Sequence, residues 1–298
     1  MASPAERASA SAFEAHRPAL LALAYKMLGE LSGAEDVVQE AWLRWQRRPA
    51  RVESPRAFLL TTVTHLCLDE LGSARARREQ SRGDRLPEPI DLDRVGLGQV
   101  ERLDQISLAF LVLLQRLTPA ERAVLLLHDV LDLSHAEIAA TLDKTEAACR
   151  QILKRARANV AEERRALRSS PEELRRILGA FVRAVREGDQ AALVDMLAED
   201  AVLTADGGPV TRRFGSLRNL RRPVRGRKRI VALVQAFGRQ GASARLEYRE
   251  RTLNGQPAMV VFLDGRPLSA MVVSLARGKI RRLFFQGDPA RLRRLRPA

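Results

Sequence analysis

Apolar residues recur at helical spacing in two neighbouring segments between residues 134 and 160. In the first segment, Ser134 and Glu137 have the spacing of a capping box, in which the serine caps the helix and the glutamate reaches back to the cap amide. In the second, Thr145 precedes inward positions that repeat every three or four residues. These inward residues are Cys149, Ile152, Leu153, Ala156 and Val160. A polar break at Asp143 separates the segments, so the pattern predicts a helix-turn-helix.

The outward face of the second predicted helix is polar and basic. Its residues are Glu146, Ala147, Arg150, Gln151, Lys154 and Arg157. Arginine and glutamine side chains pair with base edges, and cationic side chains pair with phosphate. A solvated helix face has a similar composition. Two short capped helices joined by a tight turn nevertheless favour DNA binding.

Helix starts are marked along most of the chain by a cap residue followed by proline, by a glutamate three residues on, or by both. The marked residues are Ser32, Ser54, Thr118, Ser134 and Ser170. The first 80 residues are predicted to hold helices at about 12–28, 33–47 and 55–80. Helical periodicity fails over residues 81–102, where Pro87 and Pro89 exclude a helix. We therefore predict a helical domain at 1–80, a linker at 81–102 and a helix-turn-helix domain at 103–168.

From residue 169 the pattern changes from helices to strands. Helices are expected at about 172–187, 189–198 and 227–239 and strands at about 201–204, 244–253, 257–263, 268–275 and 280–285. The turns Asn254-Gly255, Asp264-Gly265 and Arg277-Gly278 are typical of hairpins. Residues 169–298 are therefore predicted to form an α+β domain, whose curved sheet would leave a pocket for a small ligand.

The net charge of +15 is concentrated in the C-terminal part of the chain. Residues 1–168 carry a net charge of +1, and residues 169–298 carry +14. Nine of the basic side chains cluster between residues 212 and 229. Such a cluster suits nucleic acid or an acidic protein surface. A solvated loop explains it equally well.

Neither membrane insertion nor secretion is expected from this sequence. No apolar run approaches the roughly 18 residues of a membrane span, and the N-terminus lacks a basic segment followed by an apolar one. We therefore expect a cytoplasmic protein with no membrane partner. The cysteines, Cys67 and Cys149, occupy inward helix positions, so reduced core thiols are expected rather than a disulfide or a metal site. No cofactor is expected.

Four motifs in order along the chain resemble those of bacterial extracytoplasmic-function sigma factors, in the subgroup that carries a C-terminal SnoaL-like domain. The motifs are Ala34–Trp42, Leu86–Pro89, Glu146–Gln151 with Arg155–Arg157, and Arg221–Gly226. The resemblance implies a multidomain fold: two all-α domains, namely region 2 and the region 4 helix-turn-helix, followed by an α+β SnoaL-like cone domain. It also implies a subunit that directs promoter recognition and transcription initiation.

By this resemblance, the partners are promoter DNA and the RNA polymerase core, through its beta-prime clamp and beta flap. The residues implied to bind the polymerase are Asp36, Gln39, Glu40, Trp42 and Arg44. Those implied to meet the minus-10 element are Arg47, Arg48, Arg51, Arg56, His65, Asp69 and Arg75. Those implied to read the minus-35 element are Thr145, Glu146, Ala147, Arg150, Gln151, Lys154, Arg155 and Arg157.

The resemblance also implies that the C-terminal domain contacts the rest of the chain and modulates its activity. The residues implied in this regulation are Pro87, Glu88, Pro89, Asp206, Arg221, Arg222, Arg225 and Asp288. The sequence departs from the subgroup at two of these places. Asp206 begins Asp-Gly-Gly-Pro-Val where the subgroup has Asp-Gly-Gly-Gly-Lys, and Asp288 begins a partial match to Asn-Pro-Asp-Lys-Leu.

Folds of the SnoaL type include enzymes, so a catalytic role is an alternative to a regulatory one. All four histidines precede residue 136, and no cysteine follows Cys149. An acid–base site in the last domain would depend on Asp200, Asp206, Glu247, Tyr248, Glu250 or Asp264. We therefore expect no catalytic residues. Two alternatives stay open: a helix-turn-helix regulator that binds duplex DNA alone, and a pocket enzyme carried on a DNA-binding platform.

Overall fold

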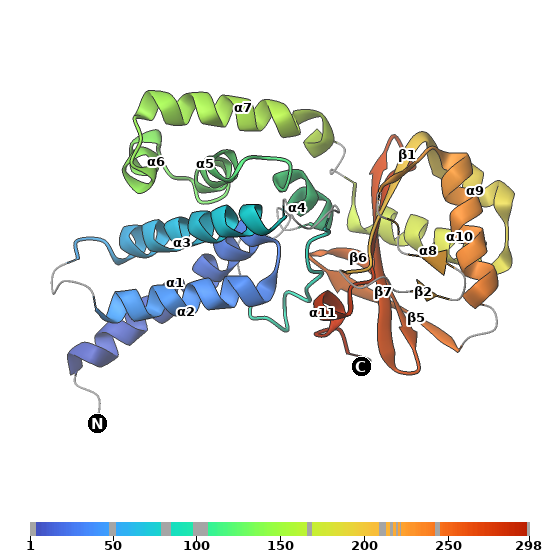
Figure 1. Cartoon of the computed structure of the whole chain (residues 1–298), viewed down its shortest axis with the longest axis horizontal. Helices are drawn as coiled ribbons and strands as arrows, with labels where there is room; N and C mark the ends of the chain where they lie inside the picture. The colour runs from blue at the N-terminus through green and yellow to red at the C-terminus, as the bar shows by residue number, and fades with distance from the viewer. Residues whose placement is uncertain are drawn as a thin grey trace. The chain divides into compact units, whose positions relative to one another are not determined.

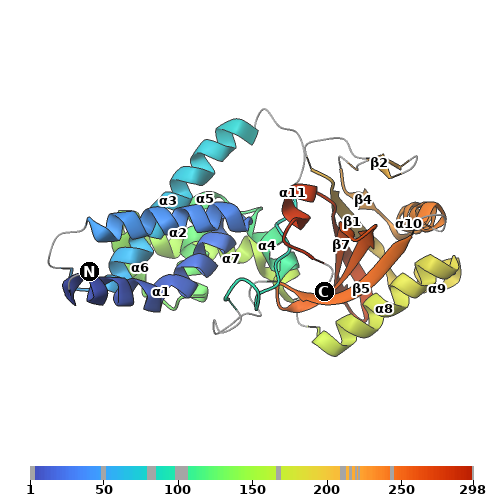
Figure 2. The ribbon, with the colours of Figure 1, turned by 90° about the horizontal axis from the view of Figure 1, so that it is seen from below.

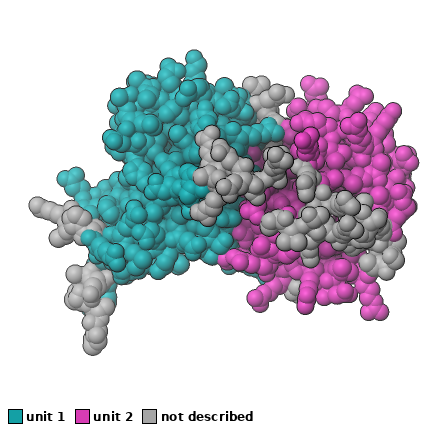
Figure 3. Space-filling view, in the orientation of Figure 1, with its two compact units in different colours: residues 1–81, 93–105, 113–161 teal, residues 82–92, 106–112, 162–298 magenta. Residues whose placement is uncertain are grey.

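The computed structural model describes residues 4–47, 52–78, 85–97, 107–165, 169–208, 213–214, 217–218, 220, 222–241 and 245–296. By their contacts, the residues divide into two compact units (Figure 3). The first holds residues 1–81, 93–105 and 113–161, and the second holds residues 82–92, 106–112 and 162–298. Most residues of the two predicted helical domains thus share the first unit, whereas residues 106–112 and 162–168 belong to the second. The beginning of the predicted linker belongs to the second.

The first unit begins with three long helices (Figure 1): α1 (Pro4–Leu28), α2 (Leu31–Gln46) and α3 (Pro55–Arg78). They enclose large buried side chains such as Tyr25 and Trp45, and the indole N–H of Trp45 donates to the Ser9 carbonyl at 2.9 Å. The predicted cap at Ser32 is wrong, because α2 begins at Leu31 with no side-chain cap. No helix among the described residues is long and apolar enough to cross a membrane.

The helix-turn-helix is preceded by two shorter helices. The bounds are α4 (Leu108–Leu114), α5 (Pro119–Asp129), α6 (His135–Leu142) and α7 (Glu146–Arg165). Thr118 and Ser134 form the predicted capping boxes, and the Thr145 hydroxyl accepts from the Ala148 N–H at 3.1 Å. Asp143 closes α6 in the left-handed conformation, with φ of 52°. The predicted pair of capped helices is therefore confirmed, including the tight turn at Asp143.

A buried arginine joins the two helical segments within the first unit. Arg122 in α5 donates through Nε to the Leu114 carbonyl at 2.9 Å, and through Nη1 to the Met27 carbonyl near the end of α1. Its side chain is almost fully buried. Because a buried cation is costly without partners, these carbonyl contacts fix α5 against α1.

The second unit is a six-stranded sheet with helices packed against it (Figure 1, Figure 2). Its helices are α8 (Pro171–Glu187), α9 (Gln190–Met196), α10 (Arg227–Gly241) and α11 (Pro289–Leu292). Its main strands are β1 (Leu197–Asp206), β5 (Leu246–Leu253), β6 (Gln256–Leu263), β7 (Arg266–Ala276) and β8 (Lys279–Gln286). The strand order is β4-β1-β8-β7-β6-β5, with β4 (Val224–Arg225) at one edge. Strand β1 runs parallel to β8 and the other neighbours are antiparallel, while β2 (Arg213–Phe214) pairs separately with β3 (Leu217–Arg218).

Two-residue turns connect the last four strands, as the sequence predicts. The turns are Asn254-Gly255, Asp264-Gly265 and Arg277-Gly278, and all six residues have positive φ. Positive φ at both central positions defines the type I′ turn, whose twist matches that of the flanking strands. Local sequence therefore sets the register of this meander.

Both faces of the sheet are apolar, and each has its own cover. Met259 and Met271 lie on the face toward α8 and α10, which we call the helix face. Val260 and Val272 lie on the opposite face, which we call the linker face because residues 85–92 lie on that side. The segments that cover the linker face supply Leu86, Leu108, Ala109, Leu292 and Leu295. Residues of the predicted linker thus form part of the core of the second unit.

Both cysteines are buried and free in the first unit. Burial raises the pKa of Cys67 to about 12, and burial also raises the pKa of Cys149. Since the thiolate is the reactive form, we expect neither thiol to react with iodoacetamide in the native chain at mildly alkaline pH. Mass spectrometry should find both alkylated after unfolding in urea. Rapid alkylation of native Cys67 would contradict this expectation.

Candidate nucleic-acid interface and linker contacts

The exposed face of α7 carries most of the residues predicted to read the minus-35 element. Arg150, Gln151 and Lys154 are exposed, while Cys149 and Leu153 on the opposite side are buried. The remaining exposed members of the predicted set are Thr145, Glu146, Ala147, Arg155 and Arg157. Amphipathic packing of α7 therefore turns the predicted base-reading side chains to the surface.

Three of these arginines also have acidic neighbours. Arg150 Nη1 lies 3.1 Å from Glu146 Oε2, one turn earlier in α7. Arg157 Nη2 lies 2.5 Å from Asp129 Oδ1 at the end of α5, and Arg155 Nε lies 3.9 Å from Glu121 Oε1. The Asp129 carboxylate is mostly buried, whereas the Glu146 carboxylate is half-exposed. Arg157 is thus held against α5, and Arg150 is the more available of the two for a ligand.

The residues predicted to bind polymerase lie on α2. Asp36 and Gln39 are exposed, and Arg44 Nε pairs with Glu40 Oε1 at 2.9 Å. The Trp42 ring packs against Phe13 of α1 with ring centroids 4.9 Å apart. Gln39 and Trp42 also border a surface hollow of about 390 Å³ between α1 and α2. This face therefore presents mixed charge beside an aromatic ring.

Two residues predicted to meet the minus-10 element instead bond the helix-turn-helix. Arg56 Nη2 donates to the Leu131 carbonyl at 3.1 Å, and His65 Nε2 lies 2.7 Å from the Thr141 carbonyl. Because a carbonyl oxygen only accepts, His65 Nε2 is the donor of that bond. The hydroxyls of Thr61 and Thr141 lie 3.4 Å apart in the same contact. This surface of α3 is therefore occupied by α6 and the loop before it.

For the other residues predicted to meet the minus-10 element, the structure gives at most their exposure. Arg47 is exposed just after α2, and Asp69 is exposed on α3. Arg48 and Arg51 lie outside the described residues. The backbone of Arg75 lies in α3, but its side chain is outside the description.

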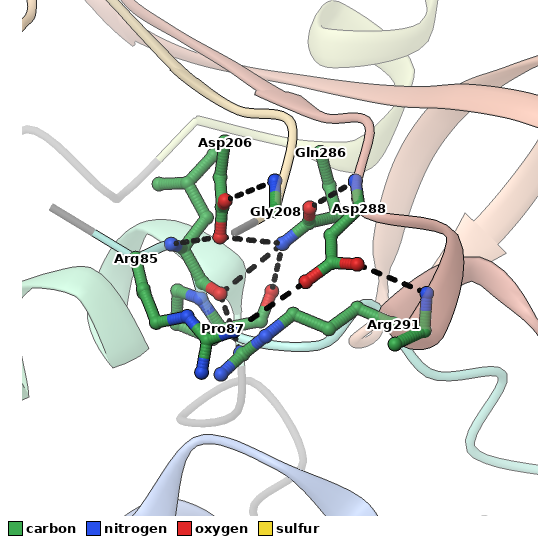
Figure 4. A network of polar contacts seen from close by, with 9 residues as sticks. Arg85, Pro87, Asp206, Gly208, Gln286, Asp288 and Arg291 are labelled. Atoms are coloured by element: carbon green, nitrogen blue, oxygen red, sulfur yellow. Dashed lines mark hydrogen bonds and ion pairs between the residues drawn. The ribbon is translucent and has the colours of Figure 1, made fainter. Parts of the chain in front are cut away.

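The second unit binds the linker through a buried polar network (Figure 4). Asp206 Oδ2 accepts from the Leu86 N–H at 2.9 Å. Gln286 Nε2 donates to the carbonyls of Leu86 at 3.1 Å and Pro87 at 3.3 Å, and Arg291 Nη1 donates to the Leu86 carbonyl at 2.5 Å. The side chains of Asp206, Gln286 and Arg291 are largely buried. Both backbone polar groups of Leu86, its N–H and its carbonyl, are therefore paired with side chains at the end of the sheet and in α11.

Asp288 supports this network from the start of α11. Its Oδ1 caps the helix by accepting from the Ala290 N–H at 3.0 Å, and its Oδ2 lies 3.7 Å from Arg85 Nη2. Gly208 has φ of 82°, and a Cβ at that position would lie 2.7 Å from the Asp288 carboxyl carbon. Any other residue at 208 would therefore be strained and would collide with Asp288. This requirement explains the second glycine after Asp206.

Further along the linker, Ile90 forms a reciprocal pair of bonds with the first hairpin turn. The Asn254 N–H donates to the Ile90 carbonyl at 2.8 Å, and Asn254 Oδ1 accepts from the Ile90 N–H at 3.2 Å. Glu88 is buried, with Oε1 lying 3.7 Å from Arg294 Nε, and Pro87 and Pro89 are buried as well. Sequence reasoning missed Asn254, Gln286 and Arg291. Of these three, only Asn254 stands in a recognisable sequence motif, and that motif predicts a hairpin turn rather than a contact with the linker.

The predicted arginine cluster contributes less to the described site. Arg222 and Arg225 are exposed, and Arg225 lies in the edge strand β4. Arg221 lies outside the described residues. No described hydrogen bond joins Arg222 or Arg225 to the linker.

The helix face of the sheet borders a cavity of about 300 Å³. Of the acid–base candidates considered from the sequence, Asp206 and Tyr248 border it. Three others form ion pairs away from it: Asp200 with Arg281, Glu247 with Arg249, and Glu250 with Arg175. Asp264 lies in a hairpin turn. The described residues of this cavity therefore offer one carboxylate, and Leu86 and Gly208 already donate to it.

Three family models match successive parts of the chain. Sigma-70 region 2 matches residues 12–77, Sigma-70 region 4 matches residues 107–160, and a SnoaL-like domain matches residues 178–282. Their order is the order predicted from the sequence.

Whole-length relatives agree with these matches. The chain is 34% identical to the ECF RNA polymerase sigma factor SigJ of Mycobacterium tuberculosis, over 96% of each protein. It is 32% identical to the probable ECF RNA polymerase sigma factor SigI of the same species, covering 96% of this chain and 95% of the relative. The crystal structure of M. tuberculosis SigJ superposes with a TM-score of 0.72 at 30% identity, covering 95% of this chain and 97% of that one. The predicted resemblance and fold class are confirmed.

We expect Asp206→Ala to loosen the linker from the sheet, because the Leu86 N–H loses a charged acceptor. Such a bond is typically worth about 1.5–3 kcal/mol, so hydrogen exchange at the Leu86 amide should accelerate by tenfold or more. The matched control is Asp195→Ala, which removes an exposed carboxylate paired with Lys279. Equal exchange at Leu86 in the two variants would show that Asp206 does not hold the linker.

Proposed function

The chain belongs to the extracytoplasmic-function family of RNA polymerase sigma factors, and from this premise we propose how its residues divide the work of promoter recognition. Its region 2 and region 4 serve transcription initiation with the RNA polymerase core at promoter DNA. The observation that supports our assignment best is α7, a capped amphipathic helix whose exposed face combines Arg150, Gln151 and Lys154. We assign to this face the reading of the minus-35 element.

We assign polymerase binding to the exposed face of α2. Asp36, Gln39 and the Glu40–Arg44 pair offer mixed charge, and Trp42 offers an aromatic edge beside the hollow. Such a surface suits the clamp of the beta-prime subunit, while the helix-turn-helix meets the beta flap. Surface ion pairs contribute little stability, so exchanging the Glu40–Arg44 pair for polymerase contacts costs little.

We propose that the first unit must open before it binds the minus-10 element. Arg56 and His65 are assigned to that element, yet both donate to carbonyls of the helix-turn-helix segment. The donors used in these bonds, Arg56 Nη2 and His65 Nε2, must be released before they can bind DNA. The arrangement described here is therefore a resting state of the two DNA-binding helices.

We propose that the C-terminal domain regulates rather than catalyses. Its buried network holds Leu86 and Pro87 of the linker between region 2 and region 4. Among the described carboxylates of this domain only Asp206 borders the cavity, and it already accepts from the Leu86 and Gly208 N–H groups. Regulation by this route acts on the linker, which limits how far region 2 and region 4 can separate.

Arg150→Ala should weaken recognition of the minus-35 element. A direct base contact is typically worth about 1–3 kcal/mol, and the Glu146 pair that competes for Arg150 is solvent-exposed. The measurement is in vitro transcription with core polymerase, on a promoter selected from a random library and on the same promoter with a mutated minus-35 element. The control is Arg183→Ala, an exposed arginine of α8. If Arg150→Ala discriminates the two templates as well as the control does, Arg150 does not read bases.

A disulfide between α3 and α6 should hold the first unit in its resting state. The facing hydroxyls of Thr61 and Thr141 suggest the double variant Thr61→Cys/Thr141→Cys, since disulfides need side chains that point at each other. We expect the oxidised protein to lose initiation and to regain it with a reductant. Thr61→Cys alone controls for the substitution. Full initiation by completely cross-linked protein would rule out the proposed opening.

A further inference from the structure

The cavity on the helix face is built from rows of side chains that run across the strands. Tyr248 on β5 pairs with Val261 on β6, which pairs with Ser269 on β7, and all three border the cavity. The next row joins Met259, Met271, Phe285 and Ala205 by the same register. Because alternate residues of a strand share a face, the register itself places these side chains together. The cavity floor is therefore formed by paired strands of the sheet.

Helices close the cavity from the other side. Phe181 and Val182 of α8 border it, as do Leu233, Val234 and Phe237 of α10. Phe181, Val182 and Val234 are buried. A volume of about 300 Å³ lies at the lower end of the range typical of small-molecule sites, about 300–1,000 Å³.

Apart from Asp206, the polar side chains of the described lining are Tyr248 and Ser269, which lie in one row. The hydroxyls of Tyr248 and Ser269 lie on the two strands that flank Val261. Burial raises the pKa of the Tyr248 phenol, so that group stays a neutral hydrogen-bond donor. A ligand with one polar end can therefore place that end between the two hydroxyls.

Charge is nearly absent from the described lining. Its ionisable side chains are Asp206 and Tyr248, and the Asp206 carboxylate accepts from the N–H groups of Leu86 and Gly208. By register Asp206 pairs with Gln286, whose side chain bonds the linker. An anionic ligand would lose its hydration in the cavity and would face the Asp206 carboxylate, and a cationic ligand would find only a carboxylate that already accepts two N–H groups; burying either charge is costly. The lining therefore selects against ionised molecules.

We propose that this cavity binds a neutral, largely apolar small molecule, of the size of a bicyclic or short tricyclic aromatic, with one hydrogen-bonding group. The proposal goes beyond the sigma-factor function and does not depend on it. The apolar walls supply the affinity, and the row of Tyr248, Val261 and Ser269 orients the polar group.

The test is titration of the full chain with N-phenyl-1-naphthylamine, a neutral aromatic whose fluorescence rises in apolar surroundings. We expect saturable binding of one probe per chain. Ala205→Phe places a ring in the cavity and should weaken binding by about tenfold or more, since a single methylene in a pocket already changes affinity by 10-fold or so. Glu199→Phe adds the same ring at an exposed position of β1 and should bind like the wild type.

A second pair of variants covers the possibility that Ala205→Phe does not fold. Leu233→Trp fills the cavity from α10, and its control is Ala232→Trp at the adjacent exposed position. Ser269→Ala tests orientation: displacement of the probe by 2-naphthol should weaken by about two- to tenfold, while displacement by naphthalene should not change. Absence of saturable binding to the wild type would overturn the proposal. Equal binding by the cavity-filling variants and their controls would overturn it as well. Neither result would bear on the proposed role in transcription initiation.

Discussion

The central constraint on the second unit is a sheet that is apolar on both faces. Antiparallel strands usually bury one face and leave the other in water. Here Val260, Val272 and Phe284 occupy the face that would otherwise be solvated. This face needs a cover, and the chain supplies Leu86 and the start of α4 together with the C-terminal residues. Releasing the linker therefore exposes apolar core residues to water. The stability of the C-terminal domain thus depends on the position of the linker.

In the first unit, several residues that suit DNA binding instead form hydrogen bonds and ion pairs within the protein. Arg56 and His65 donate to backbone carbonyls of the region 4 segment, and Arg157 pairs with Asp129. Each bond is modest on its own, and DNA offers equivalent phosphate and base acceptors. A surface of this kind can exchange one partner for another without a large change in free energy. The buried Arg122 contacts, in contrast, bind α5 firmly to α1.

The parts predicted well from the sequence are those set by neighbouring residues. The capping boxes at Thr118 and Ser134, the left-handed Asp143 and the three hairpin turns depend on chemistry within a few positions. The predicted cap at Ser32 is wrong because α2 begins at Leu31, two residues before the start that this cap would set, and the Leu31 side chain is fully buried. The roles of Gln286, Arg291 and Asn254 escaped prediction because each bonds a segment more than 150 residues away and nothing local marks such a partner. The sequence resemblance indicated the linker motif but not its acceptors.

The linker's bonds connect an early part of the chain to its last residues: Leu86 is held by Arg291, 205 positions later. A ribosome delivers the helices of region 2 and region 4 long before it delivers β8 and α11, and domains generally fold as they emerge. During translation, the DNA-binding segments therefore exist for a time without the platform that holds their connecting segment. The proposed control by the C-terminal domain can begin only after β8 and α11 have been made, and a chain that stops before them would escape it.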